Sequence, residues 1–286
     1  MLRIRNSEVA KFKRCQRAWY VSYYLGLEKA YGARTFPASF DTGNAVHAGL
    51  EAYYLGGLAA DGINRHKAEM YETFAVDADI KAWDKVYKMA HAMVEHYPSW
   101  VDGEGLDIGE STLSVEKQIE FPCADAIVTC KPDRLVETHR GLVIEDWKTG
   151  KIDRPYMFEG DWQMLNYGVA AWMETGEVPF GARHRRLNRS MHTAAAKAPQ
   201  YAEHYVVFSE ERLLMHIKHL ERAVENIIVK RNSLNDGADP VIACPPNRLT
   251  TCNWDCNAQE ICSLMDDQGD WQYVLVDEYK KREDIG

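Results

Sequence analysis

Two β-rich segments near the middle of the chain, residues 126–137 and 141–149, follow one another almost without interruption. Their connection runs from Thr138 to Gly141, a common hairpin length, and its glycine suits a positive φ. Both segments are rich in β-branched residues, which favour strands. The sequence therefore predicts an antiparallel hairpin at the centre of the fold.

The register of this hairpin brings two carboxylates together. If Glu137 pairs with Leu142, then Asp133 lies opposite Asp146. Directly opposed residues of an antiparallel pair have Cβ atoms about 4.5–5.5 Å apart, and like charges at that distance repel. Because carboxylate oxygens are the ligands that Mg²⁺ and Mn²⁺ prefer, we expect a divalent cation between them.

Lys148 lies two residues beyond Asp146 and should emerge on the same face of the strand, whereas Glu145 and Trp147 point the other way. Two carboxylates, a cation and an ammonium group are the parts needed for metal-assisted phosphodiester hydrolysis. An exposed ion pair between Asp146 and Lys148 explains the same spacing equally well.

Helical patterns surround these strands in the sequence. A first helix is expected from Ser7, acting as N-cap, to about Gly26, and a second from Asp41 or Thr42 to Gly56. The other expected elements are a strand at 112–121, one or two helices over 64–97, helices at 156–176 and 210–234, and strands at 183–189 and 201–209.

These elements predict an α/β fold with a mixed β-sheet flanked by helices, in a single domain over residues 1–286. Within it we expect a mainly helical part at 1–100, a core at 111–234 and a cysteine-rich segment at 244–265. That last segment should form a cap packed on the N-terminal helix.

Charge and hydropathy restrict the classes of function. The net charge of −9 gives no overall basic field, but it does not exclude a nucleic-acid partner. The two cationic stretches, Lys11–Arg17 and Arg183–Arg189, are best read alone as solvated faces. No apolar run of about eighteen residues and no export signal are present, so we expect a cytoplasmic protein without a membrane partner.

The order Pro132-Asp133, then Asp146-x-Lys148-Thr149-Gly150-Lys151, resembles the PD-(D/E)XK nuclease superfamily and, within it, the RecB-like exonuclease branch. The resemblance implies a restriction-endonuclease-like fold and a metal-dependent DNA nuclease. It also extends to further residues at matching positions. His47 in GNAVHAGLE resembles a histidine metal ligand, Gln163 and Tyr167 resemble a Q-x-x-x-Y motif that supports the substrate, and the carbonyl of Trp147 would add a ligand.

Cys252, Cys256 and Cys262 form a C-x3-C-x5-C pattern near the C-terminus. Such spacing suits zinc or an iron–sulfur cluster, each of which normally needs a fourth ligand, either Cys244 or a distant residue. The resemblance to AddB-type and CRISPR-adaptation exonucleases implies a 4Fe-4S cluster with Cys15 as that ligand. Those families typically have C-x2-C-x5-C, so the spacing departs from theirs by one residue.

The remaining cysteines, Cys123 and Cys130, lie on expected strands and are predicted to be core residues. They complete an odd total of seven.

The expected function is that of a metal-dependent DNA exonuclease in recombination, repair or processing, acting on ends or single strands. Its size, without helicase motifs, is similar to that of phage recombination and CRISPR-associated exonucleases, so a recombination or helicase partner is conceivable by analogy alone. Two alternatives stay open: a catalytically inactive DNA-binding accessory protein that keeps the nuclease fold, and a zinc-containing structural or regulatory protein.

Overall fold

The computed structural model describes residues 1–30, 38–72, 77–152, 161–191, 199–248, 252 and 256–282. The chain divides into two compact units, each assembled from segments that are distant in the sequence. One comprises residues 36–119 and 130–214, which we call the sheet unit, and the other comprises residues 1–35, 120–129 and 215–286, which we call the terminal unit. Each is described separately.

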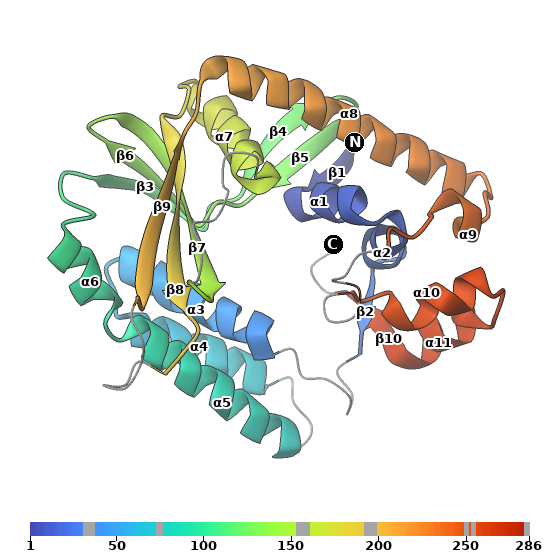
Figure 1. Ribbon diagram of the computed structural model, residues 1–286, viewed down its shortest axis with the longest axis horizontal. Helices are drawn as coiled ribbons and strands as arrows, with labels where there is room; N and C mark the ends of the chain where they lie inside the picture. Colours follow the sequence, from blue (N-terminus) through green and yellow to red (C-terminus); the bar gives the residue numbers. More distant parts are fainter. Residues whose placement is uncertain are drawn as a thin grey trace. The chain divides into compact units, whose positions relative to one another are not determined.

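The sheet unit is built on a five-stranded mixed sheet in the order β3-β6-β7-β8-β9 (Figure 1). β7 and β8 are parallel, and the other neighbouring pairs are antiparallel. The predicted mixed sheet flanked by helices is thus confirmed. The strands are β3 (Ser111–Val115), β6 (Arg134–Thr138), β7 (Gly141–Gly150), β8 (Gly181–Asn188) and β9 (Tyr201–Val207).

The central hairpin has the predicted register, since Glu137 pairs with Leu142 and Arg134 with Glu145. Two of the expected strands were wrong in their extent, because each is divided in two. Residues 112–121 separate at Glu116 into β3 and β4 (Ile119–Cys123), and residues 126–137 separate at Pro132 into β5 (Ala126–Cys130) and β6. Glu116 adopts a positive φ of 49° and proline has no N–H to donate, so neither can continue a strand.

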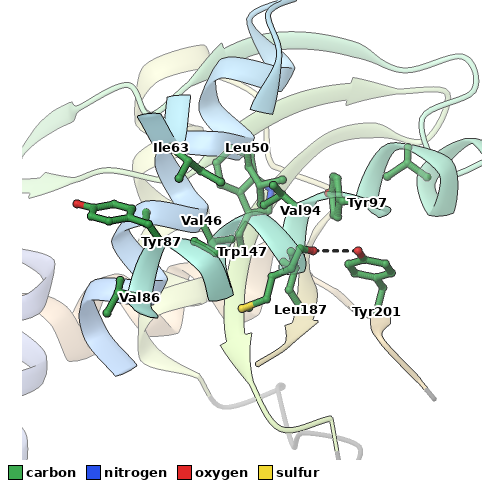
Figure 2. Packing of buried hydrophobic residues seen from close by; sticks show 14 of the residues in the cluster. Val46, Leu50, Ile63, Val86, Tyr87, Val94, Tyr97, Trp147, Leu187 and Tyr201 are labelled. Carbon is green, nitrogen blue, oxygen red and sulfur yellow. Dashed lines mark hydrogen bonds between the residues drawn. The ribbon is translucent and has the colours of Figure 1, made fainter. Parts of the chain in front are cut away.

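Helices α3 (Ala38–Tyr54), α4 (Ala59–Tyr71) and α5 (Asp77–Val94) cover one side of this sheet, and α7 (Trp162–Thr175) covers the other (Figure 1). The core between α3, α4, α5 and the sheet contains Val46, Leu50 and Trp147, all fully buried (Figure 2). Tyr201 from β9 closes it by donating its hydroxyl to the carbonyl of Met93 at 2.9 Å.

Several helix boundaries differ from the sequence predictions. The 64–97 segment forms two helices, as allowed. Pro98, however, lies in the first turn of α6 (Tyr97–Glu104) instead of ending α5, because proline is well tolerated in a first helical turn. α3 begins three residues before Asp41. α7 begins at Trp162 behind an Asp161 cap, whereas residues 156–160 of the predicted helix lie outside the described part of the chain.

The terminal unit contains a three-stranded sheet in the order β1-β5-β4, where β1 is Leu2–Arg5, and a small antiparallel pair of β2 (Leu27–Lys29) and β10 (Tyr279–Lys281). β1 leads directly into α1 (Asn6–Arg14), so Arg5 and not the predicted Ser7 is the N-cap. The other helical elements are α2 (Gln16–Trp19), the π-helical segment η1 (Tyr20–Tyr24), α8 (Glu210–Asn235, which begins in the sheet unit), α9 (Pro240–Ala243), α10 (Gln259–Asp266) and α11 (Trp271–Glu278).

Arg17 of α2 fastens the C-terminal segment to the N-terminal helices. Its guanidinium donates to the carbonyl of Cys244 at 3.3 Å, to the carbonyl of Cys262 at 2.9 Å and to the carboxylate of Asp266 at 2.6 Å. Only 1% of Arg17 is exposed, so the solvated face expected for the first cationic stretch is wrong at this residue. A buried guanidinium must be paired, and these three acceptors supply the pairing.

Among the described helices, none has the length and apolar character needed to cross a membrane.

Candidate metal centre

The centre forms along the edge of β7 that extends beyond β6, while β8 still pairs with β7 on its other edge. β6 begins at Arg134, opposite Glu145, so the backbone of Trp147 extends past the last pair of the ladder. The side chain of Asp133 takes the place of the missing strand, because its Oδ2 accepts the N–H of Trp147 at 2.5 Å. A buried carboxylate is thereby fixed against the edge of β7 that β6 leaves uncovered.

His47 reaches the same place from α3. Its Nε2 lies 2.8 Å from the carbonyl oxygen of Trp147, and its Nδ1 lies 3.4 Å from Asp133 Oδ1. Gly43, one turn earlier, allows this approach: a Cβ there would come within 3.3 Å of the Thr149 hydroxyl. The helix therefore lies close enough to β7 for His47 to contact its backbone.

Glu116 completes the group. Directly after β3 the chain turns through the positive φ of Glu116, whose N–H donates to the carbonyl of Asp133 at 2.8 Å. This turn places Oε1 of Glu116 3.4 Å from His47 Nδ1, while Oε2 lies 2.7 Å from the ammonium of Lys131. Positive φ at a residue with a side chain is uncommon and clusters at functional sites.

His47, Glu116 and Asp133 each offer a ligand atom, and these atoms lie within 4.8 Å of one another. Burial lowers the pKa of His47, but Asp133 and Glu116 outweigh burial and raise that pKa well above its usual value. The two carboxylates thus favour a positive charge at this position. One imidazole, two carboxylates and the nearby Trp147 carbonyl fit Mg²⁺ or Mn²⁺.

Asp146 lies beside this group but turns toward other partners. Its carboxylate oxygens are 3.0 Å and 2.9 Å from Nζ of Lys148, so these two side chains share a face as predicted. Burial, followed by the charge of Asp133, raises the pKa of Asp146 to about 7, against the opposing effect of Lys148. In the described part of the chain Asp146 does not belong to the group of ligand atoms within 4.8 Å, where Glu116 is found instead.

Gln163 and Tyr167 connect to the same lysine. The side-chain carbonyl of Gln163 accepts from Lys148 Nζ at 3.0 Å, and its amide donates to the hydroxyl of Tyr167 at 2.9 Å. The two residues are one turn apart on α7, behind the Asp161 cap. They therefore fix the ammonium of Lys148 from the helix side.

Sequence reasoning missed His184, which it had grouped only with a basic stretch. β8 runs parallel to β7, and this register puts His184 next to Asp146, with Nε2 3.2 Å from Asp146 Oδ2. Burial, helped by Lys148 and Arg186, lowers the pKa of His184 to about 2, so the ring is neutral. No local signal could have found this contact, because it depends on which strand lies beside β7.

The opposite face of β7 carries a buried network of charge. Glu145 is fully buried, and its carboxylate lies 3.2 Å from Arg134, 2.6 Å from Arg183 and 3.4 Å from Arg185. The indole N–H of Trp147 donates to the same carboxylate at 2.7 Å. The indole is thereby held behind the backbone that contacts Asp133 and His47.

The second cationic stretch is therefore not the solvated face expected at Arg183–Arg189. Arg183 is 3% exposed and Arg185 is fully buried. Besides Glu145, Arg183 contacts Glu110 at 2.6 Å and Arg185 contacts Asp107 at 2.7 Å. Alternate residues of a strand point to one face, and here that face meets acidic partners from the α6–β3 connection.

Two cysteines of the terminal unit, Cys15 and Cys252, contact Asn247. Its backbone N–H donates to Cys15 Sγ at 3.4 Å, and its carbonyl oxygen lies 3.8 Å from Cys252 Sγ. Cys262 Sγ lies 3.7 Å from a guanidinium nitrogen of Arg17. Among the described residues no three of these thiols lie within 4.8 Å of one another, the spacing that the His47 group meets. Cys123 and Cys130 are buried, as predicted.

A family model of the PD-(D/E)XK nuclease superfamily matches residues 6–263 of the chain. Among solved structures, a "putative exonuclease" from Eubacterium rectale is similar with a TM-score of 0.53 and 11% identity, over 90% of this chain and 86% of that one. The structure of SSO0001 matches over 86% of this chain and 94% of its own at 13% identity, but its TM-score of 0.33 is too low to bear on the fold. No curated protein sequence matches the chain.

Proposed function

The chain belongs to the PD-(D/E)XK nuclease superfamily, and we propose that it is a metal-dependent DNA exonuclease of the RecB-like branch, acting on ends or single strands. The observation that carries this proposal is the convergence of His47, Glu116 and Asp133 within 4.8 Å of one another, beside the paired Asp146 and Lys148. A catalytically inactive protein would not need two carboxylates and a histidine so close together.

Each residue of the centre would have a role that follows from its position. His47, Glu116 and Asp133 would hold Mg²⁺ or Mn²⁺, with the carbonyl of Trp147 as a further donor and Asp146 beside the group. The cation, when bound, would polarise the phosphate and supply a more acidic water. Lys148, fixed between Asp146 and Gln163, would orient the attacking water or offset charge on the phosphate. Tyr167 would hold Gln163 in place.

The test incubates end-labelled single- and double-stranded DNA with the protein and Mg²⁺ or Mn²⁺. We expect stepwise shortening from an end, which is abolished by a chelator. Lys148→Met should lower the rate about 100-fold or more, because it removes the ammonium but keeps the length of the side chain. Lys117→Ala, a change at an exposed lysine paired with Glu174, is the matched control and should cut like the wild type.

Two results would overturn the proposal. One is a wild-type protein that binds DNA but cuts nothing with either metal, which would favour the DNA-binding accessory protein. The other is a Lys148→Met variant as active as the wild type, which would remove the site from the chemistry. Internal cuts without shortening would keep the nuclease but reject the exonuclease.

We further propose that Cys15, Cys252, Cys256 and Cys262 hold a 4Fe-4S cluster that joins the two ends of the chain. Supporting this, Cys15 and Cys252 share Asn247 as a neighbour, and the pKa of Cys256 is raised by burial and then by Cys15 and Cys252. The N–H of Asn247 directed at Cys15 Sγ is the kind of contact that tunes cluster sulfurs. The role would be structural.

Purification without oxygen tests this second proposal. We expect brown protein with about four irons per chain, and loss of iron together with solubility in Cys252→Ser. Cys123→Ser, a change at a buried cysteine of β4, should leave the iron content unchanged. One zinc per chain without iron would replace the cluster by a zinc site.

A further inference from the structure

Lys131 lies at the water-facing edge of the candidate metal centre. It occupies the short connection between β5 and β6, two residues before Asp133. Its ammonium is 2.7 Å from Glu116 Oε2, and 55% of its side chain is exposed, against 12% for Glu116. Its ammonium therefore contacts the metal-binding group, while more than half of its side chain stays exposed.

The geometry of Glu116 separates the roles of its two oxygens. The backbone of Glu116 is fixed by its hydrogen bond to Asp133, and Oε1 faces His47 inside the group. Oε2 faces outward to Lys131. Lys131 thus lies next to the group of possible ligands without occupying its interior.

Lys148 and Lys131 both lie beside the centre, but they differ in how far neighbouring groups offset the positive charge of the ammonium. Lys148 contacts both oxygens of Asp146 and the side-chain carbonyl of Gln163. Within the described part of the chain Lys131 forms an ion pair with one carboxylate, that of Glu116, whose charge would be shared with a bound cation. Because Glu116 and Asp133 together offset a divalent cation, the charge of Lys131 would then lack a full counter-charge.

We propose that Lys131 binds a phosphate group of the nucleic-acid strand beside the phosphodiester that is cut, and so positions the strand over the metal centre. The proposal rests on the proposed function. An exposed ammonium at the rim of a metal site is a point charge well suited to a phosphate oxygen. An ion pair made by a largely exposed lysine contributes little to stability, so folding gives little reason for Lys131 to lie there.

The test compares Lys131→Ala with Lys117→Ala. The two lysines are matched, since their side chains are 55% and 53% exposed and each is paired with one glutamate, but Lys117 pairs with Glu174 of α7 and not with the centre. Binding of a fluorescent single-stranded oligonucleotide is measured by anisotropy at several salt concentrations, with Ca²⁺ replacing Mg²⁺ and intact DNA verified on a gel.

Lys131→Ala should weaken binding about 3- to 10-fold and reduce the slope of log K against log salt by roughly 0.7, the loss of one phosphate contact. Lys131→Arg should restore binding to within about twofold, and Lys117→Ala should match the wild type. In Mg²⁺, Lys131→Ala should raise KM with kcat within about twofold, because positioning and not chemistry is affected.

Calorimetric titration with Mn²⁺ in the absence of DNA separates this role from support of the metal site. Lys131→Ala should bind Mn²⁺ as tightly as the wild type or more tightly, because Lys131 competes for Glu116. Weaker Mn²⁺ binding, or an unchanged salt slope, would overturn the inference while leaving a working nuclease. A wild type that neither binds nor cuts DNA would instead defeat the proposed function itself.

Discussion

Glu145 and Asp146 are neighbours on β7, both almost fully buried, and they point to opposite faces of the sheet. Glu145 meets three guanidinium groups and the Trp147 indole. Asp146 contacts the ammonium of Lys148 and the ring of His184, and the negative charge of Asp133 raises its pKa. The carboxylate on one face is therefore surrounded by several positive partners, whereas the carboxylate on the other face has one ammonium partner and a negative neighbour.

The pKa values follow this difference. Burial raises the pKa of Glu145, but Arg185, Arg183 and Arg134 outweigh it, so that pKa lies below its usual value. Burial raises the pKa of Asp146 to about 7, and Lys148 does not offset the increase. The charge of Glu145 is fully offset by the guanidinium groups, and this network stabilises the sheet. The charge of Asp146 is only partly offset, and with Asp133 and Glu116 nearby an added positive charge would be favourable.

The largest expected effect is at Glu145. Glu145→Gln should lower the free energy of unfolding by about 3–5 kcal/mol, because it leaves three buried guanidinium groups short of a counter-charge. Urea denaturation followed by tryptophan fluorescence measures the change. Glu137→Gln, at an exposed carboxylate of the same hairpin, is the control and should change stability by less than about 0.5 kcal/mol. If Glu145→Gln lowered the free energy of unfolding only slightly, the two faces of β7 would not differ in how strongly they depend on a buried carboxylate.

Trp147→Phe should cost about 2 kcal/mol. It removes the indole N–H that donates to Glu145 and some buried surface, but keeps the backbone contacts to Asp133 and His47. Stability should fall in the same urea assay while the Mn²⁺ affinity stays within about threefold. A complete loss of Mn²⁺ binding would mean that the indole, and not only the strand, builds the centre.

Asp146→Asn should behave in the opposite manner to Glu145→Gln. In chelator at pH 8 we expect its unfolding free energy to stay within about 1 kcal/mol of the wild type or to rise, because the buried charge is unfavourable there. DNA cleavage should nevertheless be lost. A destabilisation as large as that of Glu145→Gln would show that Asp146 is also offset by its partners.

The pH dependence of this pair sharpens the contrast. The pKa of Asp146 is about 7 when folded and about 3.9 when unfolded, so the folded state binds more protons in between. In chelator this carboxyl makes wild-type stability rise as pH falls from 7 toward 4, and Asp146→Asn lacks that contribution. The stability of the variant minus that of the wild type should therefore increase with pH across this window, by at most about 1.4 kcal/mol per pH unit. Urea midpoints at pH 5, 6 and 7 test this, and a constant difference would contradict it.

The smallest effect is expected at Gly43. Gly43→Ala gains helix propensity of up to about 1 kcal/mol, but its Cβ comes within 3.3 Å of the Thr149 hydroxyl. Stability should change by less than about 1 kcal/mol, and Mn²⁺ affinity should fall a few-fold as His47 moves from β7. Gly57→Ala, just beyond α3 and away from the centre, is the comparison and should leave Mn²⁺ binding unchanged. Equal Mn²⁺ affinities in both variants would show that α3 can accommodate a Cβ at position 43 without displacing His47.

Much of the site could be foreseen from short-range pattern. The short hairpin predicted the register in which Glu137 meets Leu142, although Thr138 and Gly141, expected in a four-residue connection, pair with each other at the strand ends. Alternation along a strand placed Asp146 and Lys148 on one face. Helical spacing likewise brought Gln163 to Tyr167. These relations depend on a few neighbouring residues and on one turn, so the sequence contains them.

The contributions of Glu116 and His184 could not be foreseen in the same way. Glu116 is in the group because the chain turns through a positive φ there, where a continuous strand was expected. His184 contacts Asp146 because β8 is the parallel neighbour of β7, after a long connection through α7. Neither a strained turn nor a choice of strand neighbour has a local signal in this chain.

The sequence by itself determined the hairpin, the Asp146–Lys148 face and the helical positions of His47, Gln163 and Tyr167, since each follows from backbone periodicity. Only the tertiary structure decided that Glu116 joins His47 and Asp133, and that Arg183 and Arg185 are buried around Glu145. The physical reason is that burying a charge is favourable only where partners from distant segments offset it, and those partners are chosen by packing.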